Sequence, residues 1–191
     1  MYKFIRAVSL FYIYVFNRVK VTGKENVPEE DAVIICANHH SVFDILLLLT
    51  VFKRRIVFMA KQELFKIPVM GFFLRKLNAI SVDREGMPIS AVRGAMKALR
   101  SGEQLGIFPE GTRYNTGDGS DARGGVAMFS WKCKTPVLPI HLVYKRNVNI
   151  FNSYEIRIGK PVLPEELGIV KGSSEEYTKA GEHIMETVYG L

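Results

Sequence analysis

Residues 32–51, AVIICANHHSVFDILLLLTV, contain two apolar runs separated by a short polar turn. The run 32–37 has the length of a strand, and the run 42–51 has the length of a helix. His39 and Asp44 stand between them, five positions apart. An imidazole and a carboxylate at such a junction are candidate parts of a site for proton transfer. This stretch therefore predicts a strand–turn–helix unit of an α/β fold, with a candidate catalytic pair at the turn.

Ser41 and Asp44 offer a second interpretation of the same turn. Positions five apart on a continuous helix lie about 140° apart, so His39 can meet Asp44 only from the turn before the helix. Ser41 followed by an acid three residues later is also the pattern of a capping box. These residues could therefore simply start a helix. The two interpretations are compatible, because a carboxylate accepts more than one hydrogen bond.

The pair has no nucleophile of its own in the sequence. No G-x-S-x-G motif occurs, and Ser41 lies inside the same short turn, which disfavours a Ser-His-Asp hydrolase. An imidazole with a pKa near ~6.5 can take a proton from an alcohol, so the pair suits direct transfer to a hydroxyl of a second substrate. His39, His40, Asp44 and His141 have no standard metal-ligand spacing, and no metal site is expected.

From residue 21 onward, short apolar runs alternate with segments of helical length, which is the pattern of an α/β sheet. The expected strands cover residues 32–37, 56–60, 79–82, 105–108, 137–144 and 154–158. The expected helices cover residues 42–51, 90–100, 126–132 and 175–188. Residues 61–77 are very apolar but are interrupted by Pro68 and Gly71. No repeat or linker divides residues 21–191, so we expect them to form one domain.

Polar residues follow directly after four of the expected strands. They are His39, Lys61, Arg84, and Glu110 with Arg113. Ligands of open α/β sheets bind outside the carboxyl ends of the strands, so we expect these residues to converge on one edge. The turn 108–113 could present the Arg113 guanidinium to a phosphate, or it could be an ordinary turn with a surface Glu/Arg pair.

The composition describes a folded, basic chain. Of its 191 residues, 48% are hydrophobic and 24% are charged, and Lys and Arg outnumber Asp and Glu by 26 to 19, a formal net charge of +7. This charge favours anionic partners, and nucleic acid is the weaker option because no basic run is interleaved with stacking aromatics. Cys36 and Cys133 are expected to be buried small residues in a reducing compartment.

The N-terminal segment 1–20 is apolar at residues 7–16 except for Ser9, with basic residues on both sides. Its apolar part is about half of the ~20 residues that span a bilayer, and no small-residue cleavage site follows it. Two interpretations remain, an ordinary helix packed on the domain and an amphipathic helix in a membrane interface. The aromatic residues that favour the second are Tyr2, Phe4, Phe11, Tyr12, Tyr14 and Phe16.

Five sequence blocks, in order, resemble those of the PlsC-like glycerolipid acyltransferases, the family of 1-acylglycerol-3-phosphate acyltransferases. Residues 38–44 match the NHxSxxD block, and residues 108–113 match FPEGTR in full. Residues 80–84 and 137–140 resemble two further blocks, and residues 61–65 resemble the Lys-Glu-Leu-Phe segment, with Gln62 as a departure. The resemblance spans roughly residues 21–160.

The resemblance implies an α/β fold with a mixed central β-sheet flanked by helices. It implies that His39 is the general base on the acceptor hydroxyl and that Asp44 orients it. It also implies that Arg84 and Arg113 hold the acceptor phosphate, with Lys61 in an assisting role, and that Glu110 and Gly111 shape the acceptor site. The substrate-binding residues that it implies are Lys61, Arg84, Glu110, Gly111, Thr112 and Arg113.

The expected activity is transfer of a fatty acyl chain from acyl-CoA or acyl-ACP (acyl carrier protein) to lysophosphatidic acid, giving phosphatidic acid in phospholipid biosynthesis, without a cofactor. Other acceptors stay open, namely glycerol 3-phosphate, another lysophospholipid or an aminolipid, as does a non-catalytic lipid-binding protein. We expect peripheral or monotopic association with the cytoplasmic face of a membrane, through the N-terminal helix and residues 65–77. The cations expected on the anionic surface are Lys53, Arg54, Arg55, Arg75 and Lys76.

Overall fold

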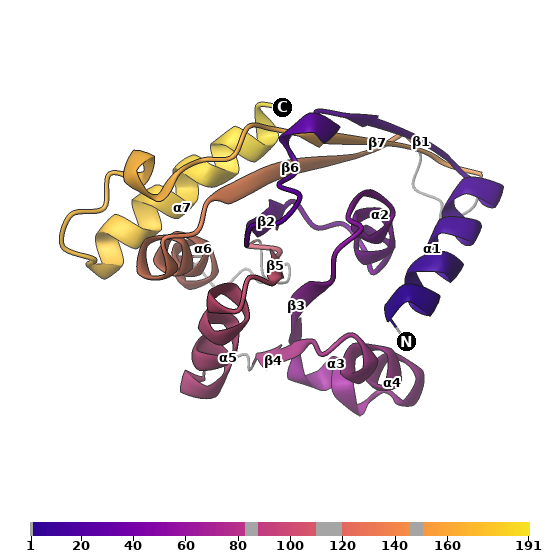
Figure 1. Ribbon diagram of the computed structural model, residues 1–191, viewed down its shortest axis with the longest axis horizontal. Coiled ribbons are helices and arrows are strands. Elements are labelled where there is room, and N and C mark those ends of the chain that lie inside the picture. The colour runs from indigo at the N-terminus through magenta and orange to yellow at the C-terminus, as the bar shows by residue number, and fades with distance from the viewer. Residues whose placement is uncertain (1, 83–87, 110–119, 146–150) are drawn as a thin grey trace.

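A computed structural model describes residues 2–82, 88–109, 120–145 and 151–191, the side chains of 120–123 excepted (Figure 1). Its described strands form one seven-stranded sheet in the order β1-β7-β6-β2-β5-β3-β4. The strands are β1 Arg18–Thr22, β2 Ile34–Ala37, β3 Ile56–Lys61, β4 Ile80–Val82, β5 Gln104–Ile107, β6 Val137–Tyr144 and β7 Ser153–Ile158.

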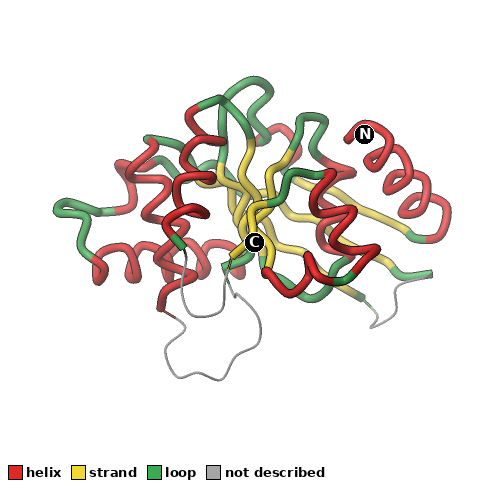
Figure 2. Tube along the Cα trace, turned by 90° about the horizontal axis from the view of Figure 1, so that it is seen from below, coloured by secondary structure: helices red, strands yellow, loops and turns green. Residues whose placement is uncertain are grey.

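The α-helices are α1 Tyr2–Phe16, α2 Phe43–Val51, α3 Gln62–Lys66, α4 Pro68–Lys76, α5 Ile89–Arg100, α6 Ser120–Cys133 and α7 Ser174–Tyr189. Short 3-10 helices cover Lys24–Asn26 and Pro164–Leu167. The sheet occupies the middle of the molecule, with helices on both sides (Figure 2).

The sheet is mixed, as expected. The strands β6, β2, β5, β3 and β4 run parallel to one another, whereas β7 is antiparallel to β6 and parallel to the edge strand β1. The carboxyl ends of the five parallel strands therefore lie at one edge of the sheet.

Both faces of β2 are buried, which explains its uninterrupted apolar sequence. Ile35 and Ala37 join the core cluster that contains residues of α1 and α2, whereas Ile34 and Cys36 join the cluster that contains residues of α5, α6 and α7. All four residues are fully buried. This alternation has the period of two that a strand imposes, and it places α1 and α2 on one face of the sheet and the other three helices on the opposite face.

Side chains of β3 fill the space above one position of the neighbouring strand β5, and that position is a glycine. A Cβ atom added at Gly106 would lie 2.6 Å from Cδ1 of Phe58 and 2.9 Å from Cγ2 of Ile56. Gly106 therefore lets the Phe58 ring lie over the middle of the sheet, next to the end of β5.

Three local features differ from the expectations. The helix expected over residues 126–132 is longer, since α6 begins at Ser120. The strand β1 was not predicted; its exposed residues alternate with half-buried ones, and the expected domain boundary at residue 20 falls inside it. The apolar segment 61–77 forms two helices, because Ile67 is extended before Pro68, which starts α4.

The helix α1 has one face packed on the domain and one face exposed. Ile5, Ser9 and Ile13 are buried at spacings of four, and Arg6 Nε donates to the carbonyl of Phe52 over 2.9 Å. The large exposed apolar residues of α1 are Phe4, Val8, Phe11, Tyr14, Val15 and Phe16. Among the described helices, none combines the length and the hydropathy needed to cross a membrane.

Candidate active site

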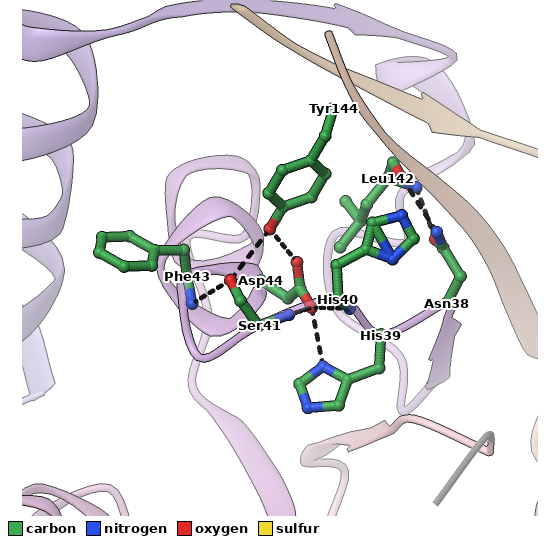
Figure 3. Close-up of polar contacts among 8 residues, drawn as sticks. All are labelled: Asn38, His39, His40, Ser41, Phe43, Asp44, Leu142 and Tyr144. Atoms are coloured by element: carbon green, nitrogen blue, oxygen red, sulfur yellow. Dashed lines mark hydrogen bonds and ion pairs between the residues drawn. The ribbon is translucent and has the colours of Figure 1, made fainter. Parts of the chain in front are cut away.

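The structure brings His39 and Asp44 together at the junction between β2 and α2. His39 lies in the turn before the helix and Asp44 lies in its first turn, and Nδ1 of His39 is 2.7 Å from Oδ2 of Asp44 (Figure 3). The Asp44 side chain is fully buried, whereas the His39 side chain is 34% exposed. The carboxylate is therefore shielded from water, and the imidazole remains accessible to a substrate.

Four donors from the described residues surround the Asp44 carboxylate. Besides His39, the backbone N–H groups of His40 and Ser41 donate to Oδ2 over 2.7 and 2.9 Å. The Tyr144 hydroxyl donates to the other oxygen, Oδ1. Figure 3 shows the carboxylate enclosed by these groups.

The hydrogen bonds determine the charge of this buried group. Burial alone raises the pKa of Asp44, but the hydrogen bonds from His39, Tyr144, Ser41 and His40 together hold that pKa below its ordinary value. Asp44 is therefore a carboxylate at neutral pH and can only accept hydrogen bonds. It follows that Nδ1 of His39 donates the shared proton, so in the neutral imidazole Nε2 has the lone pair.

The start of α2 supports this arrangement. The helix begins at Phe43, and the Ser41 hydroxyl accepts from the Phe43 backbone N–H over 3.1 Å. Asp44 accepts from the Ser41 N–H, as the acid of a capping box would. Val42, rather than Ser41, occupies the N-cap position, so the box is not complete. The two interpretations of the turn thus coexist, since the carboxylate that contacts His39 also helps to start the helix.

Asn38 fastens the turn to the neighbouring strand. Its side chain is fully buried, and its amide donates to the carbonyl of Leu142 over 3.0 Å and accepts from the Leu142 N–H over 2.7 Å. These side-chain bonds join the turn after β2 to β6 beyond the last backbone pair of the two strands, Ala37 with Ile140. Asn38 had no predicted role, although it is the first residue of the block that contains His39.

Tyr144, at the end of β6, is the second residue that the sequence analysis missed. Burial and the nearby Asp44 carboxylate raise the pKa of its hydroxyl, which is therefore a neutral donor. Its ring contacts those of His40 and Tyr154, each at a centroid distance of 4.9 Å. A tyrosine at the end of an apolar strand gives no signal that it will meet an acid one hundred positions earlier.

An aromatic stack supports the other side of His39. Its ring lies 4.3 Å from the ring of Phe108, at an interplanar angle of 26°. Phe108 follows β5 and is in turn parallel to Phe58 of β3, at 6.3 Å and 5°. The ends of β2 and β5 thus meet at the site, as expected for adjacent parallel strands.

The remaining predicted residues are only partly within the described structure. Lys61 is the last residue of β3 and precedes α3, so it lies at the same edge of the sheet as His39. Arg84, Glu110, Gly111, Thr112 and Arg113 lie outside the described residues, and their roles stay predictions. In the described part of the chain, no three His, Cys, Asp or Glu side chains gather as metal ligands would.

Comparison with known proteins agrees with this geometry. A family model described as Acyltransferase matches residues 18–143. A 1-acyl-sn-glycerol-3-phosphate acyltransferase of Bacillus subtilis is 34% identical over 140 residues, which cover 73% of this chain and 69% of that protein. An enzyme of the same name from Borreliella burgdorferi is 35% identical over 137 residues, 71% of this chain and 55% of that protein.

A solved structure is similar over the whole chain. The crystal structure of the 1-acyl-sn-glycerophosphate (LPA) acyltransferase PlsC from Thermotoga maritima has a TM-score of 0.71 and 30% sequence identity, and the match covers 100% of this chain and 79% of that one. The matched regions nevertheless span only about half of the Borreliella protein.

Proposed function

The chain belongs to the acyltransferase family, and from that premise we propose that it transfers a fatty acyl chain from an acyl thioester to the free hydroxyl of lysophosphatidic acid, forming phosphatidic acid. The observation that carries the proposal is the 2.7 Å hydrogen bond between His39 Nδ1 and a buried, ionised Asp44. The names of the similar proteins supply the acceptor, and the basic residues expected at the sheet edge suit its phosphate.

The reaction begins with removal of a proton by His39. Nε2 takes the proton of the acceptor hydroxyl as its oxygen attacks the thioester carbonyl carbon. The imidazolium that forms is stabilised by the Asp44 carboxylate, which stays ionised and keeps Nδ1 protonated throughout.

The tetrahedral intermediate then collapses. The bond between carbon and sulfur breaks, an ester forms, and the proton held on Nε2 passes to the departing thiolate. A thioester is already activated, so the reaction needs no covalent intermediate with the enzyme. Placing both substrates against His39 supplies much of the rate enhancement.

The test is an acyl-transfer assay that crosses two donors with a panel of acceptors. Acyl-CoA and acyl-ACP are each combined with lysophosphatidic acid, glycerol 3-phosphate, other lysophospholipids and an aminolipid. We expect the highest kcat/KM with lysophosphatidic acid. A higher kcat/KM with another acceptor would make that molecule, in place of lysophosphatidic acid, the assigned acceptor. Absence of transfer to every acceptor would favour a lipid-binding protein.

The enzyme associates peripherally with the cytoplasmic face of a membrane in this proposal. The exposed fractions of Phe4, Phe11 and Val69 are 68%, 66% and 69%, and their helices α1 and α4 lie on the same side of the molecule (Figure 1). Lys66 and Lys76 are exposed beside this apolar surface and suit anionic lipid.

Three cations of the expected set have other contacts. Arg75 of α4 donates to the carbonyl of Phe65 over 3.1 Å. Arg55 pairs with Glu103 at 3.5 Å, and the Arg54 guanidinium donates to backbone carbonyls of Asp31 and Gly102. Arg54 and Arg55 connect loops, so the proposed membrane surface depends less on them than on Lys66 and Lys76.

Sedimentation with vesicles tests the membrane surface. Wild type should bind vesicles that contain anionic lipid, and Phe11→Asp should weaken binding at least about tenfold, since burying a charge at the interface is unfavourable. Val170→Asp is the matched control, because Val170 is also exposed but lies far away, before α7. Equal binding by the two variants would refute this surface.

A further inference from the structure

Tyr144 contacts the Asp44 carboxylate from β6, a strand that supplies no residue to the proton transfer described above. It is the last residue of β6, four positions beyond the block 137–140. Its hydroxyl donates to Asp44 Oδ1 and lies 3.4 Å from the Ser41 hydroxyl. Tyr144 therefore joins β6 to the first turn of α2 at the site itself (Figure 3).

The position of the hydroxyl is fixed by the sheet and by ring contacts. Tyr144 is paired with Tyr154 in the antiparallel ladder between β6 and β7, and their rings meet edge to face at 86°. The His40 ring covers the Tyr144 ring from another side, at 43°. A ring held by two aromatic neighbours and a strand presents its hydroxyl at one place.

The two oxygens of the Asp44 carboxylate accept hydrogen bonds from different groups. Oδ2 accepts from His39 and from two backbone N–H groups, whereas Oδ1 accepts from Tyr144. The terminal torsion of an aspartate has a broad energy minimum, so a carboxylate held at one oxygen can still rotate. A donor fixed on Oδ1 restricts this rotation, and it thereby restricts the plane in which His39 Nδ1 must donate.

We propose that Tyr144 is a positioning residue for acyl transfer, which holds the Asp44 carboxylate in the orientation that aims Nε2 of His39 at the acceptor hydroxyl. The inference rests on the proposed function, since it assigns Tyr144 to that same reaction. Tyr144 does not itself transfer a proton. It acts through Asp44, so its loss should lower the rate of the chemical step more than it lowers binding of either substrate.

The kinetic test compares Tyr144→Phe with Tyr154→Phe. Both substitutions remove one hydroxyl from a tyrosine of the same ring pair, but only Tyr144 donates to Asp44. We expect kcat to fall about tenfold in Tyr144→Phe, the usual effect of losing a hydrogen bond to a charged group, with the acceptor KM unchanged within about twofold. Tyr154→Phe should keep kcat within about twofold of wild type. Equal kcat values for the two variants, or a change in KM alone, would overturn the inference.

A spectroscopic test does not depend on turnover. The Nδ1 proton that His39 shares with Asp44 should give a downfield proton resonance, identified by its absence from His39→Gln. We expect this resonance to shift or broaden in Tyr144→Phe and to stay unchanged in Tyr154→Phe. An unchanged resonance in Tyr144→Phe would contradict the positioning role. A wild type that shows the resonance but transfers no acyl chain would instead overturn the proposed function.

Discussion

Replacing Asp44 with asparagine removes one negative charge from the site and leaves its shape nearly intact. The amide oxygen can take the place of Oδ2 and accept from His39 and the two backbone N–H groups. The amide nitrogen then faces the Tyr144 hydroxyl, which can accept a hydrogen bond as well as donate one. The variant should therefore fold, and its defect should lie in the chemical step.

The size of that defect follows from the charge that Asp44 supplies. A carboxylate and an imidazolium with charge centres about 4 Å apart attract each other by about 4 kcal/mol at an effective dielectric constant of about 20. The His39 side chain is 34% exposed, and solvent screening reduces this value to about 3 kcal/mol. Because about 1.4 kcal/mol corresponds to tenfold in rate, kcat should fall roughly a hundredfold.

The assay measures kcat and the acceptor KM of Asp44→Asn on the preferred acceptor. The KM should change little, since the Asp44 side chain is fully buried and does not face the acceptor. Asp31→Asn, a change at an exposed acid, is the matched control and should have the wild-type rate. A folded Asp44→Asn protein with a kcat within about twofold of Asp31→Asn would refute the reasoning.

The other predictions concern stability, measured by urea unfolding with the fluorescence of Trp131, the single tryptophan. The pKa of Asp44 is lower in the folded state than in the unfolded state, so Asp44 takes up its proton at a higher pH when the chain is unfolded. The free energy of unfolding of wild type should therefore exceed that of Asp44→Asn above pH ~4. This difference should shrink as the pH falls below ~4 towards the folded-state pKa, and a constant difference from pH 7 to pH 3 would contradict the assignment. Asn38→Ala removes the side-chain partner of the Leu142 N–H and carbonyl and should lower the free energy of unfolding by about 2–4 kcal/mol. A decrease of less than ~1 kcal/mol would show that these hydrogen bonds contribute little to stability. Gly106→Ala forces a methyl group against the Phe58 ring and should lower the free energy of unfolding by about 1–3 kcal/mol. Gly94 lies in helix α5, and a Cβ atom there would meet only an ordinary contact at 3.5 Å, so Gly94→Ala should raise the free energy of unfolding by about 0.5–1 kcal/mol. Equal stabilities of the two glycine variants would contradict the close approach at Gly106.

The sequence predicted the central part of the fold because hydrophobic periodicity is strong where a strand is buried on both faces. The expected strand 137–144 matches β6, and the expected strand 32–37 contains β2. The mixed sheet flanked by helices was confirmed, and it agrees with the similarity to the Thermotoga enzyme. The N-terminal helix was also anticipated. Its two interpretations, a packed helix and a helix in a membrane interface, both stay open, because α1 has one packed face and one exposed apolar face.

The edge strand β1 was missed for a physical reason. It has five residues, and only alternate ones face the core, so its hydrophobic signal is weak. Its partner β7 lies more than one hundred residues later and runs parallel to it, so no tight turn marks the pairing.

The candidate site could be predicted only where its residues are close in the sequence. The five-residue spacing of His39 and Asp44 suggested their contact, and the structure shows it. Asn38 and Tyr144 depend on the pairing of β2 with β6, which brings together residues about one hundred positions apart. The contacts of Asn38 and Tyr144 arise from the tertiary fold, and the local sequence pattern does not predict these contacts.

The most direct measurement is the rate of acyl transfer to lysophosphatidic acid by purified His39→Gln protein, beside wild type under the same conditions. Glutamine keeps a polar group near Asp44 but cannot act as a general base, and such a base contributes about 10²–10⁴-fold. The proposed mechanism predicts a folded variant whose kcat is lower by about a thousandfold. A folded His39→Gln protein that transfers acyl chains at the wild-type rate would contradict it.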